Sequence, residues 1–196
     1  MKEKPNKTLI LASSSPRRRE LMVRAGYQFE VIEPDVDETA YPVEKYSPVE
    51  YAKTLALAKA RSVANKFRDR IVIGADTIVD YKGAIIGKAD DAEEAEQIIR
   101  KLFSRPHKVI TGIAIIRLTD NIEIAQTDTT IVFPKKMSAG QIAEHIKGQS
   151  WQGKAGAYAI QERGEKFVEK IEGSLTNVMG LPMELLKKLL ERINFF

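Results

Sequence analysis

Apolar residues along this chain follow two spacings, and each spacing predicts one kind of element. Short apolar runs or polar–apolar alternation are typical of strands and occur at 9–12, 29–32, 71–79, 84–88, 109–118, 122–133 and 166–171. Apolar residues three and four positions apart predict helices that begin near residues 16, 48, 91, 138 and 182. Capping-box patterns at Ser47/Glu50 and Ser138/Gln141 mark two of these starts. The run 71–79 is the most apolar, so we expect a central strand buried on both faces.

Composition restricts the class of protein. The 196 residues are 43% hydrophobic and 30% charged, which is typical of a soluble globular protein with a sizeable interior. No apolar run approaches the ~20 residues that span a bilayer, and the polar N-terminus predicts no signal peptide. The absence of cysteine excludes disulfides, thiolate metal sites and a cysteine nucleophile, and fits a cytoplasmic protein.

The charge of the chain bears on its partners. A net charge of +4 permits contact with nucleic acid, but the aromatic residues are not interleaved with a basic stripe. A basic cleft that binds a nucleotide accounts for the same charge. We therefore expect neither a nucleic-acid partner nor a membrane partner.

The segment after the first predicted strand combines hydroxyl groups with a cluster of arginines. We expect Ser15 to cap a helix that starts at Pro16, which places Arg17–Arg19 in the first turn. The helix dipole is positive there and disfavours cations by roughly 0.3–1 kcal/mol each. Guanidinium groups beside unpaired backbone N–H groups are, however, the parts of an anion site and suit a polyphosphate. The alternative is a solvated basic helix end in which Arg17 pairs with Glu20.

Asp76 is the anomaly of the predicted central strand. A carboxylate among isoleucine and valine residues is destabilising unless it is paired, hydrogen-bonded or bound to a metal. The strand could instead end at Ala75, with Asp76 capping a turn. Because apolar residues resume at 78–79, we favour a functional aspartate. A turn at 82–83 then brings Lys88 back toward Asp76 on a return strand.

Other charged residues each have a plain structural interpretation. The acidic stretch 33–39 is typical of a solvated loop, and Lys59 either extends into solvent or reaches a cleft. His107 and His145 lie in separate segments without metal-ligand spacing, so we expect both on the surface.

The segment 153–161 is rich in small residues. These permit close approach of the backbone to a ligand, and Lys154 and Gln161 can donate hydrogen bonds to it. The lysine follows a single glycine and no helix is indicated, unlike in a phosphate-binding loop. A glycine-rich turn before a strand explains the segment equally well.

Several motifs stand in order along the chain, namely SxSPRRxEL (13–21), GADTIV (74–79), GK (87–88), KAGAYxIQ (154–161) and VMGLP (178–182). Together they resemble the Maf family of nucleoside triphosphate pyrophosphatases, and the resemblance extends from about Thr8 to Leu190. It implies an α/β fold in which a mixed, twisted β-sheet is flanked by helices. Residues 1–196 would form one domain of two lobes with a deep cleft between them, often assembled as a homodimer.

The resemblance also implies a reaction and roles for individual residues. A nucleoside triphosphate would be hydrolysed at its α–β bond with a divalent cation, Mg²⁺ or Mn²⁺. Asp76 matches the proton acceptor near the metal, and Glu38 matches a second metal-site candidate. Positions associated with base selection correspond to Arg17, Thr77 and Gln161. The other substrate-binding matches are Ser13, Ser15, Arg18, Lys59, Lys88 and Lys154.

These roles agree with the chemistry of the side chains. Asp76 can deprotonate or orient the attacking water, and Mg²⁺ needs only one or two protein carboxylates. Arg18, Lys88 and the helix start after Ser15 are expected to neutralise the leaving pyrophosphate. The amide of Gln161 can both donate to and accept from a pyrimidine ring.

Two branches of the family differ in these motifs. GADT with KAGAYxIQ is similar to the branch that acts on dTTP and UTP, whereas the other prefers 7-methylated GTP. Departures at Ala89, Gly153 and Glu162 leave the chemical residues intact and concern the choice of base. Two alternatives stay open: a pyrophosphatase for purine triphosphates such as ITP, and a regulator of cell division that binds nucleotides or nucleic acid without turnover.

Overall fold

The computed structural model describes residues 8–158, 160 and 167–195, and the following elements belong to this part of the chain. The strands are β1 (Leu9–Ala12), β2 (Phe29–Ile32), β3 (Val72–Tyr81), β4 (Ala84–Ile86), β5 (His107–Arg117), β6 (Ile122–Pro134) and β7 (Val168–Glu172). The α-helices are α1 (Pro16–Arg24), α2 (Pro48–Ala64), α3 (Ala92–Leu102), α4 (Ala139–Lys147), α5 (Leu175–Met179) and α6 (Met183–Arg192). Short 3₁₀ turns are η1 (Glu38–Ala40), η2 (Val43–Lys45) and η3 (Leu118–Asp120).

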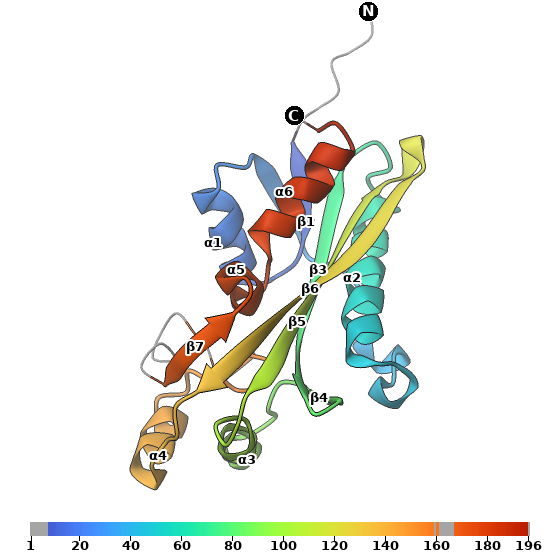
Figure 1. Cartoon of the computed structure of the whole chain (residues 1–196). Coiled ribbons are helices and arrows are strands. Elements are labelled where there is room, and N and C mark those ends of the chain that lie inside the picture. Colours follow the sequence, from blue (N-terminus) through green and yellow to red (C-terminus); the bar gives the residue numbers. More distant parts are fainter. Residues whose placement is uncertain (1–7, 159, 161–166, 196) are drawn as a thin grey trace, which may run out of the picture.

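The strands form one mixed sheet in the order β2-β1-β3-β5-β6-β7, with β4 paired to β3. β1 runs parallel to β2 and β3, whereas β3, β5, β6 and β7 pair antiparallel. The three longest strands, β3, β5 and β6, twist through the whole length of the molecule (Figure 1). β3 is buried on both faces, as the apolar run 71–79 predicts.

Helices cover both faces of the sheet near β1. α1, α5 and α6 lie on one face and α2 lies on the other (Figure 1). Successive residues of β1 therefore point into different cores, because side chains alternate across a strand. Leu9 and Leu11 pack with α1 and α6, whereas Ile10 packs with the alanines of α2.

A second lobe forms at the opposite end of the long strands. α3 and α4 pack there around Ile99, Leu102, Val132, Trp151 and Tyr158. The two lobes share β3, β5 and β6, so the expected mixed sheet with flanking helices is confirmed.

The helix starts follow the sequence in most cases. Ser47 and Ser138 both form the predicted capping boxes. Ser15 stands at the N-cap of α1, but its side chain makes no capping hydrogen bond. The five-residue α5 was not predicted, since it is too short to show helical periodicity. None of the described helices is long and apolar enough to cross a bilayer.

Candidate functional site

A cavity of about 710 Å³ lies between the two lobes. Its walls come from the loop after β1, from η1, α2 and β3, and from the segments around Lys88, Lys154 and Gly180. The predicted site residues that line it are Ser13, Ser15, Arg17, Arg18, Glu38, Lys59, Asp76, Thr77, Lys88 and Lys154. Gln161, the remaining predicted residue, lies outside the described part of the chain. The fold therefore gathers distant motifs into one hollow.

Asp76 occupies the middle of β3 and is 93% buried, with a relative exposure of 7%. Its carboxylate oxygen Oδ1 accepts a hydrogen bond from Lys59 Nζ at 2.6 Å. A buried carboxylate needs such a partner, because desolvation penalises an isolated charge. The strand continues through Asp76 to Tyr81, so the alternative in which Asp76 caps a turn is wrong.

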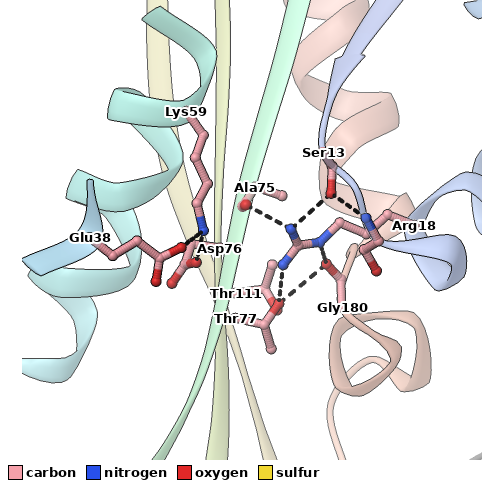
Figure 2. Close-up of polar contacts among 10 residues, drawn as sticks. Ser13, Arg18, Glu38, Lys59, Ala75, Asp76, Thr77, Thr111 and Gly180 are labelled. Carbon is pink, nitrogen blue, oxygen red and sulfur yellow. Dashed lines mark hydrogen bonds and ion pairs between the residues drawn. The ribbon is translucent and has the colours of Figure 1, made fainter. Parts of the chain in front are cut away.

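Lys59 joins two carboxylates. Its ammonium group reaches Asp76 and also Glu38 Oε1 of η1, at 2.7 Å (Figure 2). Burial would raise the pKa of Glu38, but the hydrogen bond and charge of Lys59, assisted by Lys88 and Arg18, outweigh it and hold the pKa below its usual value. Of the two alternatives for Lys59, the structure therefore selects the cleft.

Two glycines allow α2, and with it Lys59, to approach the sheet closely. A Cβ atom at Gly112 would lie 2.2 Å from the carbonyl oxygen of Ala52, and one at Gly74 would lie 2.4 Å from that of Ala56. Gly112 stands opposite Asp76 in the register of β3 and β5. Because these two glycines lack a side chain, α2 packs close enough to the sheet for Lys59 to reach Asp76.

Arg18 lies on the other side of β3 from Lys59 (Figure 2). Its guanidinium donates from Nε to the carbonyl oxygen of Gly180 at 2.8 Å. One terminal nitrogen donates to Ser13 Oγ at 3.2 Å and to the Ala75 carbonyl at 2.9 Å, and the other donates to Thr77 Oγ1 at 3.1 Å. Burial lowers the pKa of Arg18, and the charge of Asp76 opposes this effect.

These contacts place Arg18 against the two residues that flank Asp76, namely Ala75 and Thr77. Thr77 Oγ1 lies 3.0 Å from Thr111 Oγ1, and Thr111 in turn donates to the carbonyl of Asn177 at 3.1 Å. Four hydrogen bonds to described residues occupy most of the five guanidinium N–H groups. Arg18 therefore supports the strand that carries the acid, a role that the sequence did not indicate.

Several partners at the site could not be predicted from the sequence. Thr111 and Gly112 have no motif of their own, and the carbonyl of Gly180 belongs to the unpredicted end of α5. Gly180 adopts a left-handed φ of +113°, for which glycine is the natural residue. The motif VMGLP was the available signal for this turn.

The expectation that both histidines lie on the surface is wrong. His107 and His145 are 3% and 6% exposed. Each ring is hydrogen-bonded inside the second lobe, His107 to Tyr158 and Leu102 and His145 to Ala157. A histidine can be buried when its ring is hydrogen-bonded to partners from other segments, and the spacing of histidines along the sequence does not reveal such partners.

The alternative interpretation of the first turn of α1 expected Glu20 to pair with Arg17. Glu20 pairs with Arg24, one turn further along α1, at 2.5 Å. Arg17 instead contributes to the wall of the cavity.

Glu38 and Asp76 are the residues of the cavity that could hold a divalent cation. Within the described ranges, no group of three or more His, Cys, Asp or Glu side chains is arranged to hold a metal. Glu38 and Asp76 nevertheless converge, because both bind the single ammonium group of Lys59. A pair of oxygen ligands fits Mg²⁺, which usually keeps several waters and takes further oxygens from a phosphate.

Comparison with known proteins identifies relatives over nearly the whole chain. The family model described as Maf-like protein matches residues 8–193. A protein of Alkaliphilus oremlandii named dTTP/UTP pyrophosphatase is 46% identical over 90% of this chain and 91% of its own length. One of Citrifermentans bemidjiense with the same name is 43% identical over 91% of each chain.

A solved structure shares the fold. The Staphylococcus aureus Ham1 protein superposes with a TM-score of 0.54 and 16% identity, over 94% of this chain and 98% of the other. At this identity the likeness concerns the arrangement of strands and helices alone.

Proposed function

We propose that this chain, which belongs to the Maf family, is a nucleoside triphosphate pyrophosphatase that acts on dTTP and UTP. One observation carries the proposal: the cavity holds a buried aspartate, Asp76, in contact with Lys59 and surrounded by further cationic side chains. A polyanionic substrate suits such a cavity, and the relatives named dTTP/UTP pyrophosphatase supply the substrate class.

In this proposal Asp76 is the general base. It accepts a proton from a water molecule whose oxygen bonds to the α-phosphorus. The bond from that phosphorus to the bridging oxygen breaks, and its electron pair leaves with the pyrophosphate. The products are a nucleoside monophosphate and pyrophosphate.

The cations of the cavity stabilise the charge that develops on the phosphate oxygens. Arg17, Lys88 and Lys154 line the wall and are assigned to the phosphates or, for Arg17, to the choice of base. Ser13 and Ser15 stand at the start of α1, where backbone N–H groups favour an anion. Thr77 and Gln161 remain the other proposed determinants of base choice.

Glu38 and Asp76 are the residues that would hold Mg²⁺ or Mn²⁺. Such a cation, when bound, neutralises phosphate charge and lowers the pKa of a coordinated water. The ammonium group of Lys59 balances part of the negative charge of the same two carboxylates.

The test is pyrophosphate release from dTTP, UTP, the other canonical triphosphates, 7-methyl-GTP and ITP, with Mg²⁺ or Mn²⁺. We expect pyrophosphate to be released fastest from dTTP and UTP. In Asp76→Asn we expect the rate of release to fall by about 10²–10⁴-fold. Asp69→Asn is the matched control, because Asp69 is exposed and lies outside the cavity.

Three outcomes would contradict parts of this proposal. Wild-type turnover in Asp76→Asn would remove Asp76 as the base. A preference for ITP would reassign the substrate. No release from any triphosphate would reject the activity and favour a binding protein.

A further inference from the structure

One part of the cavity wall is built from the segment Gly153–Tyr158. Gly153, Lys154, Ala155 and Tyr158 all line the cavity. The backbone of this segment meets the two residues that follow β4. Ala155 forms an isolated bridge with Lys88, and the Gly156 N–H donates to the carbonyl oxygen of Gly87 at 2.9 Å. These backbone hydrogen bonds tie the segment that carries Lys154 to the residues after β4.

The turn inside this wall has an unfavourable backbone conformation. Gly156 has a φ of +73° and Ala157 has a φ of +58°. A left-handed conformation is easy for glycine but disfavoured for alanine, so Ala157 adopts it only where the surroundings enforce it. Side chains of other elements should therefore hydrogen-bond to this turn and hold its conformation.

His145 is the first such group. It belongs to α4, is 6% exposed, and its Nε2 atom lies 2.9 Å from the carbonyl oxygen of Ala157. A carbonyl oxygen only accepts, so Nε2 carries the hydrogen and donates it. The buried imidazole thus binds the residue that has the disfavoured φ.

His107 is the second. Its Nδ1 atom lies 3.2 Å from the carbonyl oxygen of Leu102 and its Nε2 atom lies 2.7 Å from the hydroxyl of Tyr158. Nδ1 must donate to the carbonyl, which leaves Nε2 of the neutral ring to accept from the tyrosine hydroxyl. Burial lowers the pKa of His107, in keeping with this neutral form.

The rings around Tyr158 fix its orientation. Phe103 and His107 contact it edge-to-face, with centroid distances of 5.3 and 5.7 Å. Tyr158 is therefore oriented on two sides while it lines the cavity.

We propose that His107 and His145 are positioning residues, which hold the Gly153–Tyr158 wall in place through Tyr158 and Ala157 and thereby set the affinity of the site for the triphosphate. Neither histidine lines the cavity, so both act through the wall. The inference rests on the proposed function, because affinity is defined here by the nucleotide.

The kinetic experiment uses dTTP with Mg²⁺ and compares Tyr158→Phe, His107→Gln and His107→Asn with wild type. Loss of one neutral hydrogen bond is expected to raise KM about three- to tenfold in Tyr158→Phe and leave kcat within about twofold. Glutamine can replace the acceptor at Nε2 and should restore most of the affinity, whereas asparagine reaches only the Leu102 side and should not.

Tyr81→Phe is the matched control. The Tyr81 hydroxyl bonds Ser104 at 3.3 Å on the exposed side of the second lobe, outside the cavity. We expect its KM and kcat to equal those of wild type. An unchanged KM in Tyr158→Phe and in both His107 variants would overturn the proposal. So would a fall of kcat at constant KM, which indicates a smaller folded fraction.

A second readout needs no nucleotide. The Gly156 amide should exchange its hydrogen about three- to tenfold faster in His107→Asn and in His145→Ala, but not in Tyr81→Phe. Unchanged exchange in both histidine variants would reject the positioning role. If wild type hydrolyses no triphosphate, the proposed function fails, while the exchange measurement still decides whether the histidines hold the wall.

Discussion

Arg18 is a partly enclosed cation whose described hydrogen-bond acceptors are two carbonyls and two hydroxyls. Neutral acceptors leave its charge to be balanced at longer range, and the carboxylates that raise its pKa against burial are Asp76 and Glu38. The positive charge beside the cavity is therefore built into the fold.

Arg18→Lys tests this role. A lysine ammonium cannot reproduce the planar fork of the guanidinium, so we expect a loss of roughly 2–4 kcal/mol in the free energy of unfolding. Urea denaturation measures it, with Arg24→Lys as the control because Arg24 is exposed and pairs with Glu20. Equal stabilities of the two variants would show that Arg18 has no special structural role.

His107 should make the stability of the protein depend on pH. Burial lowers the pKa of His107 in the folded state below the ordinary histidine value of 6.5, so the unfolded state binds this proton at a higher pH. The contribution of His107 is then complete above about pH 6.5 and decreases as the pH falls through that value toward the folded pKa. Carboxylates with lowered pKa lose their contributions only at more acidic pH, below about 4.5.

The measurement is urea unfolding at pH 7.5 and pH 5.5. Wild type should lose up to about 1.4 kcal/mol more than His107→Gln over this interval. Identical losses in the two proteins would mean that His107 does not titrate differently on folding.

At the scale of elements, α2 packs closely against the β3–β5 pair. Alanines on the helix face Gly74 and Gly112 on the strands, and this contact delivers Lys59 to Asp76. The contact leaves no room for a methyl group.

Gly112→Ala should therefore destabilise the protein by about 1–3 kcal/mol or more, because its Cβ would meet the Ala52 backbone. The displacement of α2 should also reduce pyrophosphate release. Gly140→Ala is the control with the opposite sign: Gly140 lies in α4 with open space around it, and alanine favours a helix by roughly 0.5–1 kcal/mol. Thermal unfolding of both variants measures these changes in stability. An unchanged melting temperature in Gly112→Ala would contradict the close packing of α2 on the sheet.

The elements themselves were largely predictable, while their contacts were not. Apolar runs and capping boxes reflect local physics, so the strands and the longer helices appear where the sequence predicts them. α5 and the buried histidines were missed, because their stability comes from tertiary partners such as Thr111 and Tyr158.

At the scale of the whole molecule, the order of the strands in the sheet brings the residues of the candidate site together. Parallel pairing of β1 with β3 brings the start of α1, which carries Arg17 and Arg18, close to Asp76. β5 pairs antiparallel with β3 and extends with it into the second lobe. The sequence motifs contain eight of the ten predicted residues that line the cavity, and the resemblance added Glu38 and Lys59 and assigned the roles of all ten. Distances and partners required the fold, since three of the four acceptors of Arg18 lie 57 to 162 positions away along the chain.

The bond between Arg18 and Gly180 also has a consequence for biosynthesis. Its two partners are separated by 162 residues, so the nascent chain carries the arginine long before its acceptor exists. At roughly 5–20 residues per second, the ribosome needs about 8 to 32 seconds to extend the chain by these 162 residues. Through this period Arg18 of α1 lacks its native acceptor, and the cavity can be completed only after Gly180 has been synthesised.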